Sequence, residues 1–364
     1  MSGAEFSGRG PECPRQGHFW IEFLRFAVML GVVGIHVSAD VITEWGKVPA
    51  AWWWSAHLYD SLIRGCVPLF VMISGALLLS KQEGLADFFL KRCRRILLPF
   101  LFWTAVFLIW KKLHKAPDMT LFDALRDAAG DRVYYHLWFL YVIAGLYLAA
   151  PILRVFVRHA SASELTLFLS LWFLLSSIVP AVSKVLQTLT GEPLRWALSV
   201  PFAQGYIGYF LLGYCLTRFF NSAWIKPAYL LWLASLVLCI AGEGWLSLQA
   251  GRFTGFFYDN FSPNVVIYTA SFFVIAQGWG DRLKGLLGTK LRSVISSASG
   301  ASFGIYLMHP LWIDFYNSGW GGFVLNGKSH HPLWMIPLTV AAIYLPSWGC
   351  SALLQKLPVL RKVV

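Results

Sequence analysis

The sequence predicts an all-α integral membrane protein with about ten transmembrane helices in one domain. Of its 364 residues, 57% are hydrophobic and only 13% are charged, and the mean hydropathy is +0.59. No soluble domain needs so much apolar surface, and in lipid each span must satisfy its own backbone hydrogen bonds, which favours helices. The formal net charge of +12 is typical of basic cytoplasmic loops, so we expect no nucleic acid partner.

Hydrophobic windows long enough to cross a bilayer place these helices along the chain. The predicted spans are 19–42, 56–80, 94–112, 133–157, 163–183, 196–217, 225–247, 262–280, 294–315 and 332–355. The sequence contains no internal repeat and no linker-like segment between them. The predicted organisation is therefore a tail at 1–18, one membrane domain at 19–355 and a second tail at 356–364.

The distribution of basic residues predicts the orientation of the chain. An even number of spans places both termini on the same side, and cytoplasmic loops carry the excess of Lys and Arg. Most of the 30 basic residues fall in segments that face inward if the N-terminus is cytoplasmic. The exception is the outward loop from Lys111 to Arg132, in which several aspartates offset the basic residues. We therefore expect both tails to be cytoplasmic.

The first span carries ionisable residues that an apolar helix normally avoids. Arg25, His36 and Asp40 lie within the run Trp20–Asp40, and charges inside a membrane are costly and usually functional. Arg25 and His36 are eleven positions apart, about three helical turns, so they share a face and lie roughly 16 Å apart. Asp40 lies one turn beyond His36. One face thus presents a cation, an imidazole that can accept a proton and a carboxylate that can orient it, which are candidate catalytic groups.

A polar chamber that opens outward is predicted from residues in other spans. His57, Asp60 and Arg64 follow an i, i+3, i+7 pattern, which places them on one helix face as candidate substrate-binding residues. Asp60 and Arg64 are equally consistent with a structural ion pair. The orientation brings four histidines to a similar outer level: His36, His57, His136 and His309.

The segment KQEGLADFFLKRCRRILLPF, before the third span, concentrates Lys91, Arg92, Arg94 and Arg95 on the cytoplasmic side. These residues are consistent with ordinary positive-inside charge. They are also consistent with an anion site for a polyphosphorylated cytosolic ligand, because arginine binds phosphate with two parallel hydrogen bonds.

Cysteines and potential metal ligands do not form a recognisable pattern. The six cysteines contain no Cys-x-x-Cys pair, so no disulfide framework is expected. No set of His, Cys, Asp and Glu has ligand-like spacing, and we expect no metal ion.

Several motifs occur in order from the first span to the ninth. They are Arg25-x10-His36, VPLFVMISGALLL at Val67–Leu79, FFLKRCRRILLPF with Arg92-x-x-Arg95, HLWFLYVIAG at His136–Gly145 and SFGIYLMHP at Ser302–Pro310. Together they resemble the acyltransferase-3 family of membrane O-acyltransferases. Within it, the resemblance suggests bacterial inner-membrane O-acetyltransferases that act on surface polysaccharides, such as enterobacterial common antigen or xanthan-type exopolysaccharide.

The resemblance implies roles for individual residues. His36 would be the essential histidine and Arg25 its partner, and Arg92 with Arg95 would meet the acyl donor on the cytoplasmic side. Weaker expectations place a further set of residues in or near the cavity: Ser74, Gly75, Trp138 and His309.

These interpretations combine into one expected mechanism. Acetyl-CoA, the co-substrate, docks on Arg92 and Arg95, and its pantetheine arm passes Arg25 so that the thioester reaches His36. The imidazole acts either as general base on a sugar hydroxyl or as a nucleophile that forms an acetyl-imidazole, and the sequence leaves both open. Asp40 is expected to orient the imidazole.

The expected acceptor is a lipid-linked oligosaccharide or polysaccharide on the periplasmic face, and the expected surroundings are membrane lipid and polysaccharide assembly proteins. One alternative is a transporter or flippase for polysaccharide precursors, in which the polar chamber is a translocation site. Another is a non-catalytic subunit of a polysaccharide assembly complex. The missing repeat and the cytoplasmic arginine pair count against a transporter.

Overall fold

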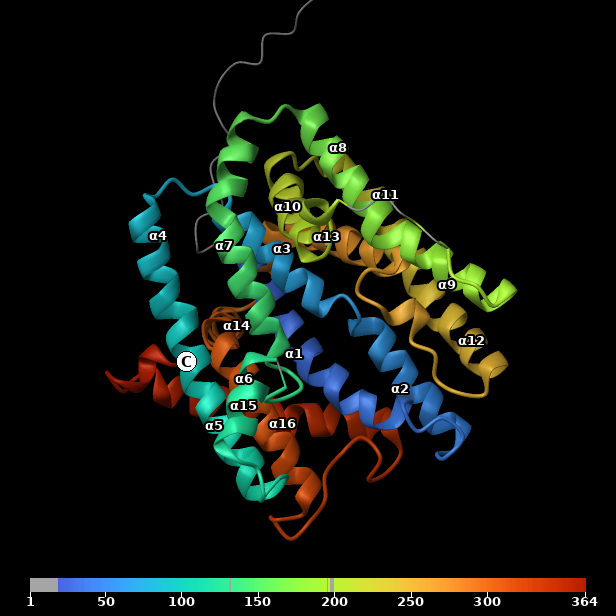
Figure 1. Ribbon diagram of the computed structural model, residues 1–364, viewed down its shortest axis with the longest axis vertical. Coiled ribbons are helices and arrows are strands. Elements are labelled where there is room, and N and C mark those ends of the chain that lie inside the picture. The colour runs from blue at the N-terminus through green and yellow to red at the C-terminus, as the bar shows by residue number, and fades with distance from the viewer. Residues whose placement is uncertain (1–18, 131, 195, 197–199) are drawn as a thin grey trace, which may run out of the picture.

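The computed structural model describes residues 19–130, 132–194, 196 and 200–364 (Figure 1). The predicted tail at 1–18 and part of the predicted span 196–217 lie outside these residues. Every regular element in the described part of the chain is a helix. The α-helices are α1 Phe19–Ile42, α2 Ala50–Ile63, α3 Cys66–Leu78, α4 Leu85–Arg92, α5 Leu98–His114, α6 Leu121–Ala129, α7 Trp138–His159, α8 Ala162–Phe173, α9 Val179–Thr190, α10 Tyr206–Arg218, α11 Ile225–Val237, α12 Glu243–Ala250, α13 Pro263–Leu286, α14 Thr289–Gly300, α15 Ser302–Ser318 and α16 Pro332–Leu354.

Short turns of other helix types connect several of these elements. Five-residue π-helical turns join α4 to α5, α8 to α9 and α11 to α12: Cys93–Leu97, Leu174–Ile178 and Leu238–Gly242. Single 3-10 turns complete the described elements at Pro201–Ala203, Ser222–Trp224, Phe256–Tyr258 and Leu360–Lys362. The π turns keep each pair of helices continuous, so each pair acts as one long span with a local change in direction.

Within the described residues, seven helical segments are long and apolar enough to cross a membrane. They are Phe19–Ile42, Ala50–Leu78, Leu85–His114, Trp138–His159, Ala162–Thr190, Ser222–Ala250 and Pro332–Leu354. The prediction of a multi-pass, all-α membrane protein is confirmed, but the count of about ten is not. The other predicted spans correspond to α10 and α15, with 13 and 17 residues, and to α13, which has 24 residues. The first two are shorter than a bilayer normally requires, and α13 is less apolar.

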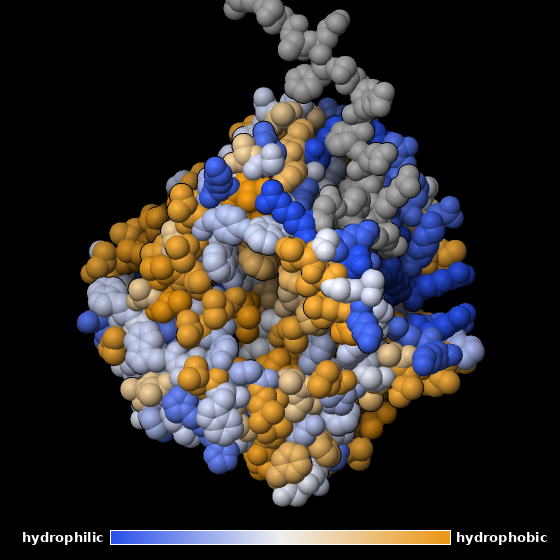
Figure 2. All heavy atoms as spheres, turned by 180° about the vertical axis from the view of Figure 1, so that it is seen from behind, coloured by the Kyte–Doolittle hydropathy of each residue, from blue (hydrophilic) through white to orange (hydrophobic). Residues whose placement is uncertain are grey.

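The surface agrees with a membrane environment. Large apolar side chains are exposed on most of the spanning segments, for example Leu101, Leu148, Leu230 and Leu338. Figure 2 shows such apolar residues over much of one face, with the most hydrophilic residues gathered mainly in its upper right part. Exposed apolar side chains in this quantity are stable only when lipid covers them.

The first helix, α1, lies in the middle of the molecule (Figure 1). It contacts α2, α3, α13, α14, α15 and α16, and α4 and α5 lie on one side of it in this view, with α9 and α12 on the other. We call the end of the molecule where α1 begins the inner end and the end where α1 finishes the outer end. The ionisable groups of α1 are therefore held inside a helical bundle.

The predicted span 56–80 is two helices that break at Arg64 and Gly65, between α2 and α3. A Cβ atom at Gly65 would lie 2.9 Å from the Thr269 hydroxyl, so α13 closes tightly over the break. The predicted span 294–315 is likewise divided, into α14 and α15. Both corrections have the same cause, since packing against neighbouring helices decides where an apolar segment bends.

The outer loop between α5 and α7 contains α6, which begins with a Thr120–Asp123 capping box. The expected offset between basic residues and aspartates is present here, because Lys111 pairs with Asp127 at 2.8 Å and Arg126 with Asp123 at 3.2 Å.

Close packing of α3 against α10 depends on glycines. A Cβ atom at Gly75 would lie 1.7 Å from the backbone oxygen of Phe210, and one at Gly213 would lie 2.1 Å from that of Met72. Small residues allow helix backbones to approach within a membrane. The glycine of the Val67–Leu79 motif is therefore explained by helix packing.

We expect the Gly75→Ala variant to lose about 1–3 kcal/mol of stability, because α3 and α10 must separate to admit the methyl group. The control is Gly145→Ala on α7, where no heavy atom lies within 4 Å of the added Cβ. Thermal unfolding of both variants in the same detergent measures the difference. An equal melting temperature for the two variants would contradict this account of the packing.

Candidate functional site

Three of the four predicted outer histidines meet at the outer half of the bundle. His36 on α1 stacks on His309 of α15 with ring centroids 5.3 Å apart, and His136, just before α7, meets His309 edge-on at 5.5 Å. The ring of Tyr135 packs against that of His36, with the ring centroids 4.8 Å apart. We call these residues the histidine cluster. Tyr135 is 47% exposed, so the cluster reaches the surface on that side.

The histidine cluster contains buried nitrogens that lack hydrogen-bond partners among the described residues. His309 is 0% exposed, and its Nδ1 lies 2.7 Å from the carbonyl oxygen of Tyr306. Nδ1 therefore carries the proton, which leaves Nε2 as an acceptor, and this atom has no partner. Both ring nitrogens of buried His136 also lack one. Buried polar atoms of this kind are costly, and they are typical of a place where a substrate is bound or transformed.

His57 lies apart from the other three histidines. Its ring stacks on Trp53, its Nε2 donates to the carbonyl oxygen of Ile240 at 2.9 Å, and its Nδ1 meets the Tyr258 hydroxyl at 2.5 Å. Both nitrogens are therefore used within the protein. Shared depth did not place His57 in the histidine cluster, because α2 turns this side chain toward α11 and α12.

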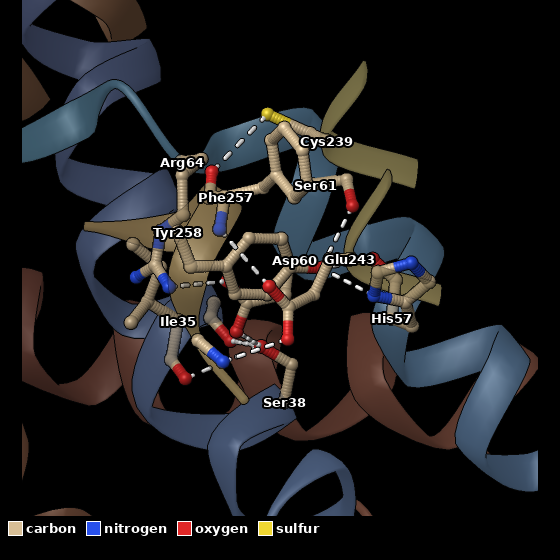
Figure 3. Close-up of polar contacts among 12 residues, drawn as sticks. Ile35, Ser38, His57, Asp60, Ser61, Arg64, Cys239, Glu243, Phe257 and Tyr258 are labelled. Carbon is tan, nitrogen blue, oxygen red and sulfur yellow. Dashed lines mark hydrogen bonds and ion pairs between the residues drawn. The ribbon is translucent and has the colours of Figure 1, made fainter. Parts of the chain in front are cut away.

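Asp60 and Arg64, from the same predicted face, form a buried ion pair at 3.1 Å beside the break between α2 and α3 (Figure 3). Asp60 also accepts a hydrogen bond of 2.9 Å from Ser38 on α1, and the Arg64 guanidinium lies over the ring of Tyr258 at 4.8 Å. The charge of Arg64 acts on the imidazole of His36. This group thus connects α2 with the face of α1 that carries His36.

Asp40 lies one turn beyond His36 at the outer end of α1. Its carboxylate is hydrogen-bonded to Asn317, and the charge of Lys328 acts on it. Within the described residues, no hydrogen bond joins Asp40 to His36. An effect of Asp40 on the imidazole would act through charge across the space between them.

A second polar group lies near the inner end of the bundle, around Arg25. The charge of Arg95 acts on Arg25. Tyr147 on α7 lies where both charges act on it, and it is hydrogen-bonded to Ser74, whose hydroxyl also donates to the Phe70 carbonyl at 2.9 Å. We call Arg25, Ser74, Arg95 and Tyr147 the inner basic group. No described carboxylate forms an ion pair with either arginine, so the group has an excess of positive charge that suits an anion.

Arg92 has different surroundings from Arg95, although the sequence motif joins them. It forms an ion pair with Glu83 at 3.0 Å, and Glu83 also binds Arg154 at 2.9 Å and Lys91 at 3.2 Å. The guanidinium groups of Arg92 and Arg154 both lie 4.5 Å from the centre of the Phe88 ring. Glu83 therefore neutralises part of the charge of Arg92, which is expected from the sequence to bind the acyl donor together with Arg95.

Trp138 begins α7 two residues after His136. Its ring lies 6.0 Å from that of Tyr206 on α10, whose hydroxyl accepts a hydrogen bond of 2.8 Å from Asn260. Trp138 thus faces α10 and extends the aromatic surroundings of the histidine cluster in that direction.

Four residues of these groups were not predicted from the sequence as site residues: Glu83, Tyr135, Tyr147 and Arg154. Two are aromatic residues in or beside an apolar helix, where the pattern indicates packing. The spacing of Glu83 and Arg154, 71 positions apart, gives no local signal. No three His, Cys, Asp or Glu side chains within the described parts of the chain are arranged to hold a metal ion.

The ion pairs of Glu83 predict how stability depends on pH. Burial opposes its ionisation, but hydrogen bonds from Arg154 and Lys91 and the charge of Arg92 outweigh this effect and lower the pKa of Glu83 from 4.5 to about 2. A carboxylate with a depressed pKa stabilises the fold above its unfolded pKa, and the contribution disappears as the pH falls toward the folded value.

We therefore expect the melting temperature to fall between pH 5 and pH 2, and to fall less in Glu83→Gln, which is already less stable at pH 7. Asp118→Asn, at an exposed position in the outer loop, is the control and should follow the native protein. Thermal unfolding across this pH range checks the result. Identical pH profiles for Glu83→Gln and the native protein would show that the ion pairs contribute nothing.

Comparison with known families adds one finding. Residues 18–354 match the acyltransferase-3 family, which is described as an acyltransferase domain. The match runs from the start of α1 to the end of α16 and includes both the histidine cluster and the inner basic group. No curated protein and no solved structure matches the chain.

Proposed function

The chain belongs to the acyltransferase-3 family, so its chemistry is acyl transfer, and we propose that it moves an acetyl group from cytoplasmic acetyl-CoA to a sugar hydroxyl. The observation that carries this proposal is the placement of two polar groups on one buried helix. Arg25 of the inner basic group and His36 of the histidine cluster lie on the same face of α1, about 16 Å apart. An extended pantetheine arm can span that distance.

The inner basic group is the proposed docking site for the donor. CoA is a polyanion, and Arg95 and Arg25 offer charge-assisted hydrogen bonds to its phosphates. Ser74 and Tyr147 add hydroxyl groups along the path toward His36. Arg92 contributes when it exchanges Glu83 for a phosphate, because its charge is otherwise balanced by that carboxylate.

His36 is the proposed catalytic residue. As a general base, its imidazole takes the proton of the hydroxyl while the hydroxyl oxygen attacks the thioester carbonyl. The C–O bond forms, the C–S bond breaks, and the proton passes to the departing thiolate. As a nucleophile, the imidazole attacks the thioester carbonyl, so that a C–N bond forms, the C–S bond breaks and the CoA thiolate leaves with the proton that the ring loses. The hydroxyl oxygen then attacks the acetyl-imidazole, the C–O bond forms, the C–N bond breaks, and the hydroxyl proton returns to the ring. The stacked ring of His309 limits the orientations open to His36 in both cases.

Other residues act around this centre in the proposal. Asp40 stabilises positive charge on the imidazole through space, and Arg64 lies on the acceptor side, where its charge acts on His36. Asp60 holds Arg64, and His57 supports the same wall through Tyr258. Trp138 gives the acceptor an aromatic surface.

The outer position of the histidine cluster supports a periplasmic acceptor. We propose a lipid-linked oligosaccharide or a growing surface polysaccharide, of the enterobacterial common antigen or xanthan type, in a bacterium whose inner membrane holds the protein with both termini cytoplasmic. Membrane lipid surrounds it, and polysaccharide assembly proteins are the proposed neighbours. The acetylation assay of His36→Ala, described next, distinguishes this function from the transporter alternative.

We expect His36→Ala to abolish O-acetylation, because removing a general base or nucleophile costs at least about 10²-fold in rate. The measurement is the O-acetyl signal in proton NMR of surface polysaccharide from a deletion strain. This strain expresses the native protein or the His36→Ala variant at equal membrane level. The matched control is His330→Ala, an exposed histidine outside the histidine cluster. Unchanged acetylation together with reduced polysaccharide export in the deletion strain would favour the transporter.

We expect Arg95→Gln to raise the KM for acetyl-CoA about tenfold while kcat changes little, because one charge-assisted contact to the donor is lost. The neighbouring Arg94 is also exposed, and Arg94→Gln is the matched control for charge near the membrane surface. Steady-state kinetics of the purified protein in nanodiscs measures both. A KM that rises equally in the two variants would point to general electrostatic attraction and would overturn the docking site.

A further inference from the structure

A pocket of about 400 Å³ lies at the inner end of the bundle, between the start of α1, the end of α13 and α14. It is separate from the histidine cluster and contains no member of the inner basic group. The residues that line it are Phe19, Glu22, Lys284, Thr289, Arg292, Ser293 and Ser296. Sequence reasoning assigned none of them a role beyond positive-inside charge.

The wall formed by α14 is polar along one helix face. Thr289, Arg292, Ser293 and Ser296 follow an i, i+3, i+4, i+7 pattern, so all four side chains face the pocket. α14 begins at Thr289 without a side-chain cap, and the N–H groups of an uncapped first turn favour an anion. Hydroxyl groups, a guanidinium and a helix N-terminus together are the donors that phosphate groups bind.

The charges of the pocket are unbalanced. Lys284 and Arg292 form no ion pair with a described carboxylate, and Nε of Arg292 is buried without a hydrogen-bond partner. Glu22 is the acidic residue of the lining, and its carboxylate already accepts a hydrogen bond from Ser296. The pocket therefore offers a cationic wall with unused donors.

The pocket adjoins the inner basic group. Glu22 precedes Arg25 by one helical turn on α1, and its charge acts on Arg25. A volume of about 400 Å³ exceeds the need of a single phosphate and falls in the range for small-molecule sites. Phe19 adds an apolar ring beside the cations, and aromatic rings stack on nucleobases.

We propose that this pocket binds the phosphorylated nucleotide end of the CoA donor. The adenosine 3′-phosphate lies against Arg292, Lys284 and the start of α14, which leaves Arg25 and Arg95 for the pyrophosphate and the pantetheine arm. This assignment deepens the proposed function and rests on it for the identity of the ligand. An anionic lipid headgroup shares the phosphate chemistry and is distinguished by the experiment.

The first measurement is direct binding of adenosine 3′,5′-bisphosphate to the full-length protein in nanodiscs of neutral phosphatidylcholine. Arg292→Gln should weaken binding about tenfold, because one charge-assisted contact to phosphate is lost, and Lys284→Gln should weaken it as well. Lys290→Gln is the matched control, since Lys290 is an exposed cation of α14 outside the lining. His36→Ala should bind like the native protein. Equal affinity for native protein and Arg292→Gln would overturn the assignment.

The second measurement compares two donors in the transfer assay. Arg292→Gln should raise the KM about tenfold for acetyl-CoA and leave it unchanged for S-acetyl-4′-phosphopantetheine, which lacks the nucleotide. His36→Ala should be inactive with both. Transfer activity that remains in His36→Ala would contradict the proposed function but would leave the nucleotide-binding result unchanged. The proposed function and the nucleotide pocket can therefore be disproved separately.

To test an anionic lipid headgroup as the ligand, both measurements are repeated in nanodiscs that contain phosphatidylglycerol. The nucleotide assignment predicts that the effect of Arg292→Gln is present in neutral lipid. An effect that appears only with phosphatidylglycerol would assign the pocket to a lipid headgroup and overturn the proposal. Arg292→Lys keeps the charge and should restore much of the affinity, and size-exclusion profiles verify that each variant is folded.

Discussion

A polar side chain that this protein places inside the membrane is costly unless it finds a partner in the protein itself, because lipid offers no hydrogen bonds. α1 shows how the fold meets this constraint. Ser38 donates to Asp60 on α2, Glu22 accepts from Ser296 on α14, and the imidazole of His36 packs on that of His309 on α15. The polar residues of one central helix thus fix the positions of three neighbours, and the apolar residues between them fill the core.

The same constraint separates structural from functional groups. His57 uses both ring nitrogens within the protein, and Asp60 pairs with Arg64 and accepts a hydrogen bond from Ser38. His136 and His309, in contrast, retain buried nitrogens with no described hydrogen-bond partner. Arg92 is balanced by Glu83, whereas no described carboxylate pairs with Arg95. Pairs that are satisfied stabilise the bundle, and the unsatisfied groups of the histidine cluster and the inner basic group are the candidates for contact with a substrate. This contrast, at both ends of α1, supports the proposed path for acyl transfer through the bundle.

Part of the site could be predicted because its signal is local. The eleven-residue spacing of Arg25 and His36 fixes a shared face in any α-helix, and apolar composition fixes the membrane class. The partner of Asp40 was not predictable in this way, since Asn317 lies on α15 and nothing in the sequence of α1 points to it. The pocket beside α14 is similar, because its walls come from segments more than 240 residues apart in sequence.

The sequence by itself determined that this protein is an all-α membrane protein, that α1 carries a cation and an imidazole on one face, and that its motifs are those of an acyltransferase. These properties depend on composition and on the helical repeat, which act over a few turns. Only the tertiary structure decided that α2 and α3 break at Gly65, that His57 turns away from the histidine cluster, and that Glu83 gathers Arg92 and Arg154. Each of these depends on contacts between distant helices, and packing rather than local preference selects them.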